Sequence, residues 1–200
     1  MRRFVCNSWH LFRCLLNVGL FRIYQMPFTP LHMGPGAAIK AVLGQYFSLM
    51  VFGVAQIAMD IEPLVRIIRG DSLIHGFTHT YIGATLIGIA TFVVGWPFCQ
   101  GTLRFWNFIT KPKFLRWLHA SSPISKFAAF SGAFVGTFSH VFLDSIMHVD
   151  IHPWIPLNEG NSMLHFISVG WLHLFCVGLG VAGFMALFVI FVWNKIAIKI

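Results

Sequence analysis

The chain has 200 residues, of which 57% are hydrophobic and only 10% are charged. Soluble domains carry about 25% charged residues, so this chain cannot cover itself with a solvated surface and we expect a bilayer to surround it. The net charge of +8 comes from Lys and Arg that lie mainly in linkers and near the ends. That distribution is typical of membrane flanks and argues against a nucleic-acid partner.

Residues 1–25 differ from the rest of the chain, because they hold four arginines and two cysteines but no long apolar run. A signal peptide is a poor fit, since Arg13 interrupts the apolar region. We expect either an amphipathic helix at the membrane surface or a translation start at Met26. Residues 26–200 are then predicted to form a single integral membrane domain.

The segment between His32 and Asp60 is too long for a simple membrane span and is interrupted at Gly44. We predict a helical hairpin with a short helix at about Gly36–Leu43, a turn, and a second helix at about Phe47–Met59. This hairpin would return Asp60 to the side of the membrane where His32 lies.

Three long apolar runs follow, from Tyr81 to Phe98, from Phe127 to Met147 and from Gly170 to Trp193. Each is close to the roughly 20 residues that cross a hydrocarbon core, and in lipid each must be helical to satisfy its backbone groups. The first run is expected to end at Trp96-Pro97. The predicted fold class is therefore all-α, a polytopic membrane protein with three long transmembrane helices and an N-terminal helical hairpin.

The linkers between these runs differ in charge. Five Lys and Arg residues separate the first run from the second, whereas the stretch from His148 to Gly170 has none. By the positive-inside rule the first linker faces the cytoplasm and the second faces outward. We expect the inner membrane of a bacterium, with the His148 side outside.

A motif of the form H-x3-D-x3-H lies at the end of the second run, in His140, Asp144 and His148. Residues four apart share one face of a helix, so the three side chains would form a line. An ionisable group at membrane depth is costly, so it indicates a functional site and needs a partner. Asp60, at the end of another apolar segment, is a second such group.

Further candidate ligands lie close to the ends of the same segments. His75 and His79 form H-x3-H before the Tyr81 run, and His152 follows His148 just before a proline. Imidazole and carboxylate ligands favour zinc or a similar divalent ion. The candidate ligands for one to three such ions are His32, Asp60, His75, His79, His140, Asp144, His148 and His152. The remaining histidines, His10, His119, His165 and His173, are expected to be interfacial residues.

Four short motifs occur in a fixed order along the chain. They are Thr29-Pro30-Leu31-His32, Asp60-Ile61-Glu62-Pro63, His75-Gly76-Phe77-Thr78-His79-Thr80 and Ser139-His140-Val141-Phe142-Leu143-Asp144. In these motifs the chain resembles the membrane-bound metal-dependent hydrolases of the YdjM type, the LexA-regulated inner-membrane proteins. The order is also distantly similar to that in zinc-dependent phospholipase C and the P1 nucleases.

The second resemblance implies how the ligands would be shared. One ion would be held by Asp60, His140 and Asp144 together with His79 or His75. Asp144 would bridge to a second ion held by His32. A third ion would lie between His148 and His152. The reaction implied is hydrolysis of a phosphoester by metal-activated water.

The sequence thus predicts a membrane-embedded hydrolase with a lipid or lipid-linked phosphoester as substrate. Asp150 and Glu62 are candidates for a general base. The same residue types would also suit a metal-ion or proton-coupled transporter, which needs a polar path through the bilayer. A third reading is a non-catalytic protein with a structural metal, whose site would be closed by four protein ligands.

Overall fold

The computed structural model describes residues 30–112, 120 and 123–197, and every regular element in these residues is a helix. The extension predicted for residues 1–25 lies outside the described residues. Three helices are long and apolar enough to cross a membrane, spanning Tyr81–Ile109, Lys126–Met147 and Val169–Asn194. The predicted fold class is therefore confirmed.

The N-terminal hairpin is present. It consists of η1 (Pro30–His32), α2 (Met33–Leu43), η2 (Gly44–Tyr46) and α3 (Leu49–Met59). The turn is held by Lys40, whose Nζ donates to the carbonyls of Gly44 and Phe47, each at 2.8 Å. Ser48 caps α3 by accepting a hydrogen bond from Val51 N, which satisfies one of the free N–H groups at a helix start. The hairpin brings His32 and Asp60 to the same end of the bundle, as predicted.

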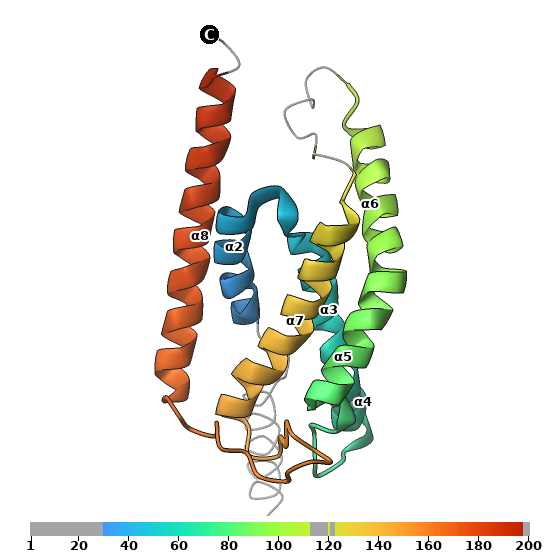
Figure 1. Ribbon diagram of the computed structural model, residues 1–200, viewed down its shortest axis with the longest axis vertical. Helices are drawn as coiled ribbons and strands as arrows, with labels where there is room; N and C mark the ends of the chain where they lie inside the picture. Colours follow the sequence, from blue (N-terminus) through green and yellow to red (C-terminus); the bar gives the residue numbers. More distant parts are fainter. Residues whose placement is uncertain (1–29, 113–119, 121–122, 198–200) are drawn as a thin grey trace, which may run out of the picture.

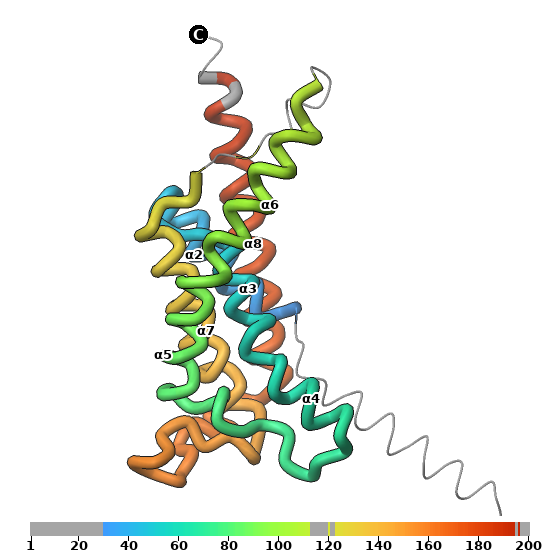
Figure 2. Tube along the Cα trace, turned by 90° about the vertical axis from the view of Figure 1, so that its right-hand side faces the viewer, coloured from blue at the N-terminus to red at the C-terminus, as the bar shows by residue number. Residues whose placement is uncertain are grey.

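A short helix that the sequence analysis did not anticipate follows directly, α4 (Ile61–Arg69). It ends at Gly70, whose φ of 78° is the left-handed conformation that favours glycine. An exposed apolar stripe on α4 repeats at helical spacing, in Ile61, Leu64, Val65 and Ile68. Figure 2 shows α4 leaving the end of α3 at the edge of the bundle. Such a stripe is typical of a helix at a membrane surface.

The first long helix corrects a prediction. The sequence analysis ended this run at Trp96-Pro97, but α5 (Tyr81–Ala90), the π-helical turn η4 (Thr91–Gly95) and α6 (Trp96–Ile109) form one continuous helix. A proline normally breaks a helix, because it lacks an N–H and its ring clashes with the preceding turn. The wider π turn directly before Pro97 relieves this conflict and lets the helix continue.

The remaining helices are α7 (Lys126–Met147) and α8 (Val169–Ala197). Figure 1 shows α7 in the centre of the bundle beside α3, and α8 at the left with α2 against its inner side. The loop of residues 148–168 joins α7 to α8 across the bottom of the view. Its backbone is tied to the helices there, for example through Tyr81 N, which donates to Pro153 O at 3.0 Å.

Glycines allow the central helices to approach closely. A Cβ at Gly132 of α7 would lie 2.5 Å from the carbonyl oxygen of Ser48, and a Cβ at Gly136 would lie 2.7 Å from the Cβ of Ala55 and 3.1 Å from the carbonyl oxygen of Phe52. The α3–α7 contact therefore brings two backbones together, which is how helices associate without a hydrophobic driving force in lipid. This close contact fixes the position of the α7 residues that follow it, His140 and Asp144.

We predict that Gly132→Ala lowers the midpoint of thermal unfolding in detergent, because its methyl group meets backbone that cannot move aside. The expected cost is about 1–3 kcal/mol. Gly101→Ala is the matched control, since nothing lies within 4 Å of a Cβ there. Alanine is the better helix former, so this control should leave stability unchanged or raise it by up to about 1 kcal/mol. Equal midpoints for the two variants would contradict the close α3–α7 contact.

Candidate metal centre

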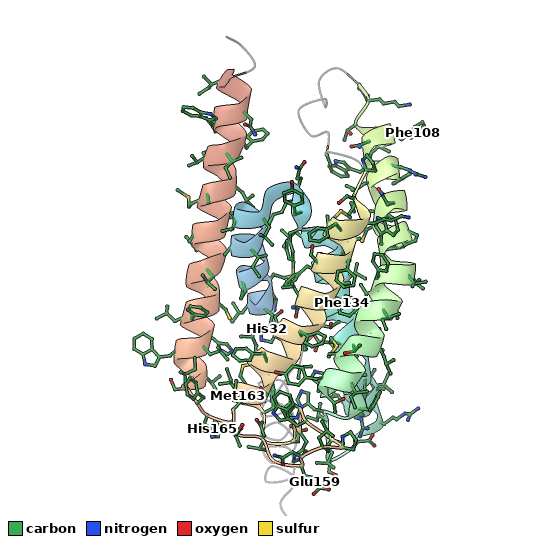
Figure 3. The ribbon with its side chains drawn as sticks, viewed as in Figure 1. His32, Phe108, Phe134, Glu159, Met163 and His165 are labelled. Carbon is green, nitrogen blue, oxygen red and sulfur yellow. The ribbon has the colours of Figure 1, made fainter. Side chains whose placement is uncertain are left out.

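Ionisable side chains from distant parts of the sequence meet at one end of the bundle. His32 lies just before α2, Asp60 joins α3 to α4, and His79 immediately precedes α5. His140 and Asp144 lie on the last turns of α7. Figure 3 shows His32 at the lower end of α2, beside α7. All five side chains are at least nine-tenths buried.

Four of these residues form a compact group in which one donor atom from each lies within 4.8 Å of every other. His140 Nε2 lies 3.1 Å from Asp60 Oδ1 and 3.1 Å from Asp144 Oδ2. His79 Nε2 lies 3.3 Å from the same Asp144 oxygen. Ligands about 2.1 Å from a tetrahedral zinc ion would be separated by about 3.4 Å. The spacing in the structure is therefore close to that of a metal site.

The donor atoms in this group lack hydrogen-bond partners. They are the Nε2 atoms of His79 and His140, Oδ1 of Asp60 and both carboxylate oxygens of Asp144. Buried polar atoms are nearly always hydrogen-bonded, and an unpaired buried carboxylate is especially costly. A divalent cation would take one donor atom from each of the four residues, and two carboxylates would neutralise its charge. The residues therefore fit a metal ion.

The Nδ1 atom of His140, the ring nitrogen that does not face the carboxylates, is held by Gln56 of α3. Gln56 Nε2 donates to Gly136 O at 3.1 Å, which directs the amide oxygen toward the imidazole. His140 Nδ1 lies 2.6 Å from that oxygen and must donate its proton to it. In the neutral imidazole, which is the form that binds a metal ion, Nε2 then carries no proton and faces Asp60 and Asp144. Hydrogen bonds of this kind orient the histidine ligands of metal sites.

His79 is held in the same way through a hydroxyl group. Thr78 Oγ1 donates to Glu62 Oε2 at 2.7 Å, so it can only accept from His79 Nδ1, which lies 3.0 Å away. This hydrogen-bond chain again leaves Nε2 as the free donor atom. The carboxylate at the end of this hydrogen-bond chain is that of Glu62. It belongs to α4, the helix that begins directly after the candidate ligand Asp60.

A second group lies beside the first and contains His75, His148 and Asp150. The rings of His75 and His148 are 4.3 Å apart, and those of His75 and His79 are 4.7 Å apart. His75 Nδ1 lies 2.9 Å from Asp150 Oδ1, while His75 Nε2 is buried without a partner. This group is less buried than the first, because His148 and Asp150 are partly exposed.

His32 lies at the edge of the first group. Its Nε2 is 3.6 Å from Asp144 Oδ1, the oxygen that points away from His79 and His140. Both ring nitrogens of His32 are buried without hydrogen bonds. Asp144 therefore lies between His32 on one side and the two other histidines on the other, which is the arrangement that a bridging carboxylate requires.

One predicted ligand is not brought to either group. His152 is exposed, and its Nδ1 contacts the carbonyl oxygen of Glu159 on the 148–168 loop at 2.5 Å. The distant resemblance to phospholipase C and the P1 nucleases implied that it would share an ion with His148. The chain turns after Asp150, and His75 takes the place beside His148 instead.

The two candidates for a general base both have oxygens that already accept hydrogen bonds. Asp150 accepts from the backbone N–H groups of Ile74 and His75, each at 3.0 Å, and from the His75 ring. Glu62 accepts from Arg66 and Thr78. A role as general base would require breaking these bonds. In the structure both carboxylates position histidines instead.

These contacts also set the charge of the two carboxylates. Burial would raise the pKa of Asp150, but its bonds from His75 and Ile74 outweigh this and hold the pKa well below its ordinary value. Burial likewise acts against ionisation of Glu62, and the hydrogen bonds from Thr78 and Arg66 leave its pKa lowered. Both side chains are therefore anionic at neutral pH and accept hydrogen bonds from the groups that they position.

Comparison with known proteins adds no further assignment. No family model, no curated protein and no solved structure matches this chain. The site must therefore be judged from its own geometry.

We predict that detergent-purified protein retains about one to three equivalents of zinc or a similar ion, measured by elemental analysis. Asp144→Ala and His140→Ala should each lose the ion of the first group, because each removes a donor at its centre. His152→Ala is the control and should keep the wild-type metal content. Folded wild-type protein that takes up no metal, even from added zinc, would refute the assignment.

We also predict that Thr78→Val weakens metal affinity by about 10–100-fold, the range found when a partner of a histidine ligand is lost. Valine keeps the shape of threonine but cannot link Glu62 to His79. Thr85→Val is the matched control, since the Thr85 hydroxyl donates only within its own helix, to Tyr81 O. Competition with a chelator of known affinity measures both variants. Equal affinities would show that the Thr78 hydroxyl does not position the ligand.

Proposed function

We propose that this protein is a membrane-embedded, metal-dependent hydrolase that acts on a phosphoester. The observation that supports this most directly is the set of buried, unpartnered donor atoms at one end of the bundle. Such a concentration of perturbed ionisable groups is costly to maintain and is characteristic of functional sites.

The distribution of buried charge favours an enzyme over a transporter. In the described residues, the fully buried Asp and His side chains are His32, Asp60, His75, His79, His140 and Asp144, all in or beside the two groups. Farther along the bundle the buried polar side chains of the described residues, such as Thr91 and Thr137, are uncharged, and Val51, Cys99, Ala129 and Ala133 pack together. A transport path would need polar groups along the membrane normal.

The two groups together favour catalysis over a purely structural role. The first offers four donor residues, as a closed structural site does, but Asp144 also extends toward His32. The second offers the unpartnered Nε2 of His75 beside His148, with Asp150 orienting His75, and so would leave positions open for water or substrate. Neighbouring metal ions are typical of enzymes that cleave phosphoesters.

When bound, divalent ions would polarise a phosphoryl oxygen and lower the pKa of a water molecule. The residues of this chain supply the rest of the site. His79 and His140 present unprotonated nitrogens, Asp60 and Asp144 balance the positive charge, and the surrounding helices exclude bulk water. In the net reaction an oxygen of water bonds to phosphorus, the ester P–O bond breaks, and a proton from water passes to the leaving alcohol.

We predict that the metal-loaded protein hydrolyses a soluble phosphodiester such as bis(p-nitrophenyl) phosphate, or a phospholipid from a broad panel. Activity should disappear with a chelator and return with zinc or manganese. Asp144→Asn should retain less than about one hundredth of the rate, as expected from losing several kcal/mol of transition-state stabilisation. His152→Ala should remain active. Metal-loaded protein that cleaves no phosphoester in the panel would reject this function.

A further inference from the structure

An apolar groove of about 370 Å³ runs between α3 and the α5–η4–α6 helix. This volume lies within the range of small-molecule sites. Its walls include Val54 and Ala58 from α3 and Ile87, Ala90, Val94 and Phe98 from the opposite helix. Val94 and Phe98 are 69% and 67% exposed, so the groove is open along a membrane-spanning segment.

One end of the groove lies near the end of the bundle that holds the metal centre, although the groove lining and the candidate ligands share no residue. Ala58 precedes the candidate ligand Asp60 by two residues, which is about 3 Å along the axis of α3 and on the opposite face of that helix. Ile87 packs against the buried cluster of Met59, Ala84 and Val141, and Val141 directly follows His140. The far end lies near Gly95, where a Cβ would be 3.1 Å from Val54 Cγ1.

The wall formed by α5, η4 and α6 extends over about one leaflet of a bilayer, whereas the α3 wall spans only Val54 to Ala58. From Ile87 to Phe98 the helix rises about 16 Å. A hydrocarbon core is about 30 Å thick, so this wall covers about half of it. A lipid chain placed there would run from the membrane interior toward the end of the bundle where the buried carboxylates and histidines meet.

We propose that this groove binds one hydrocarbon chain of a phospholipid substrate and so directs the phosphoester of that lipid to the metal centre. This inference rests on the proposed hydrolase function and names its substrate class. A second apolar groove, of about 290 Å³ between α2 and α8, begins beside His32 and is the competing site. The α3–α5 groove is larger, and α3 leads directly into a ligand.

Ala90→Trp tests the groove, because Ala90 is an exposed residue of its wall and an indole there would fill it. Ile89→Trp is the matched control, since Ile89 is 47% exposed on the same helix but outside the groove lining. With metal-loaded protein, Ala90→Trp should lower kcat/KM for a long-chain phospholipid by about tenfold, through lost methylene contacts. Cleavage of bis(p-nitrophenyl) phosphate and the metal content should stay at the level of Ile89→Trp.

A photo-crosslinking measurement tests the groove without catalysis. A phosphatidic acid with a diazirine near the end of one chain, incorporated in phosphatidylcholine vesicles, should label residues 87–98 of the wild-type protein. Labelling there should fall several-fold in Ala90→Trp and persist in Ile89→Trp.

The outcomes separate this inference from the function on which it rests. Equal effects of Ala90→Trp and Ile89→Trp on long-chain substrate, or crosslinks confined to residues 177–184 by the competing groove, would overturn the chain-binding role while leaving the hydrolase intact. A wild-type protein that crosslinks at residues 87–98 but cleaves no phosphoester would reject the hydrolase and leave only a lipid-binding groove. Uniform labelling of all lipid-facing helices would identify ordinary bilayer contact and reject the groove.

Discussion

The arrangement of this molecule depends on the cost of placing two carboxylates and several imidazoles where water cannot solvate them. Buried ionised groups require opposite charge and hydrogen bonds from their surroundings. The chain provides hydrogen-bond partners for the Nδ1 atoms of His75, His79 and His140. The inner donor atoms remain unpartnered. A bound cation would supply a partner for these nitrogen and carboxylate oxygen atoms and would balance the negative charge.

The supporting contacts connect the site to the packing of the whole bundle. Gln56 can reach both Gly136 O and His140 because glycines let α3 lie against α7 at backbone distance. Glu62 can reach Thr78 because α4 turns back under the loop that precedes α5, where Gly76 leaves room for the ion pair of Glu62 with Arg66. The close α3–α7 contact and the hydrogen bonds that position the buried histidines are thus parts of one construction.

The sequence was informative where a local repeat determined the geometry. The spacing of His140 and Asp144 placed both on one helix face, and the break at Gly44 predicted the hairpin that returns Asp60 to His32. Tertiary contacts could not be predicted, because nothing local marks Gln56 or Thr78 as partners of histidines. The pairing of His152 with His148 rested on a distant family resemblance, and the structure places His152 away from both groups. The proline at position 97 misled the prediction of a helix end, because a π turn has no clear sequence signal.

The order of the ligands along the chain has a consequence for biosynthesis. Asp60 and His79 leave the ribosome well before His140 and Asp144, which lie on the second of the three spans. The first group is therefore incomplete until α7 has been inserted and packed against α3. An ion bound by this group would therefore enter only after this insertion, and its binding would contribute directly to the stability of the finished bundle.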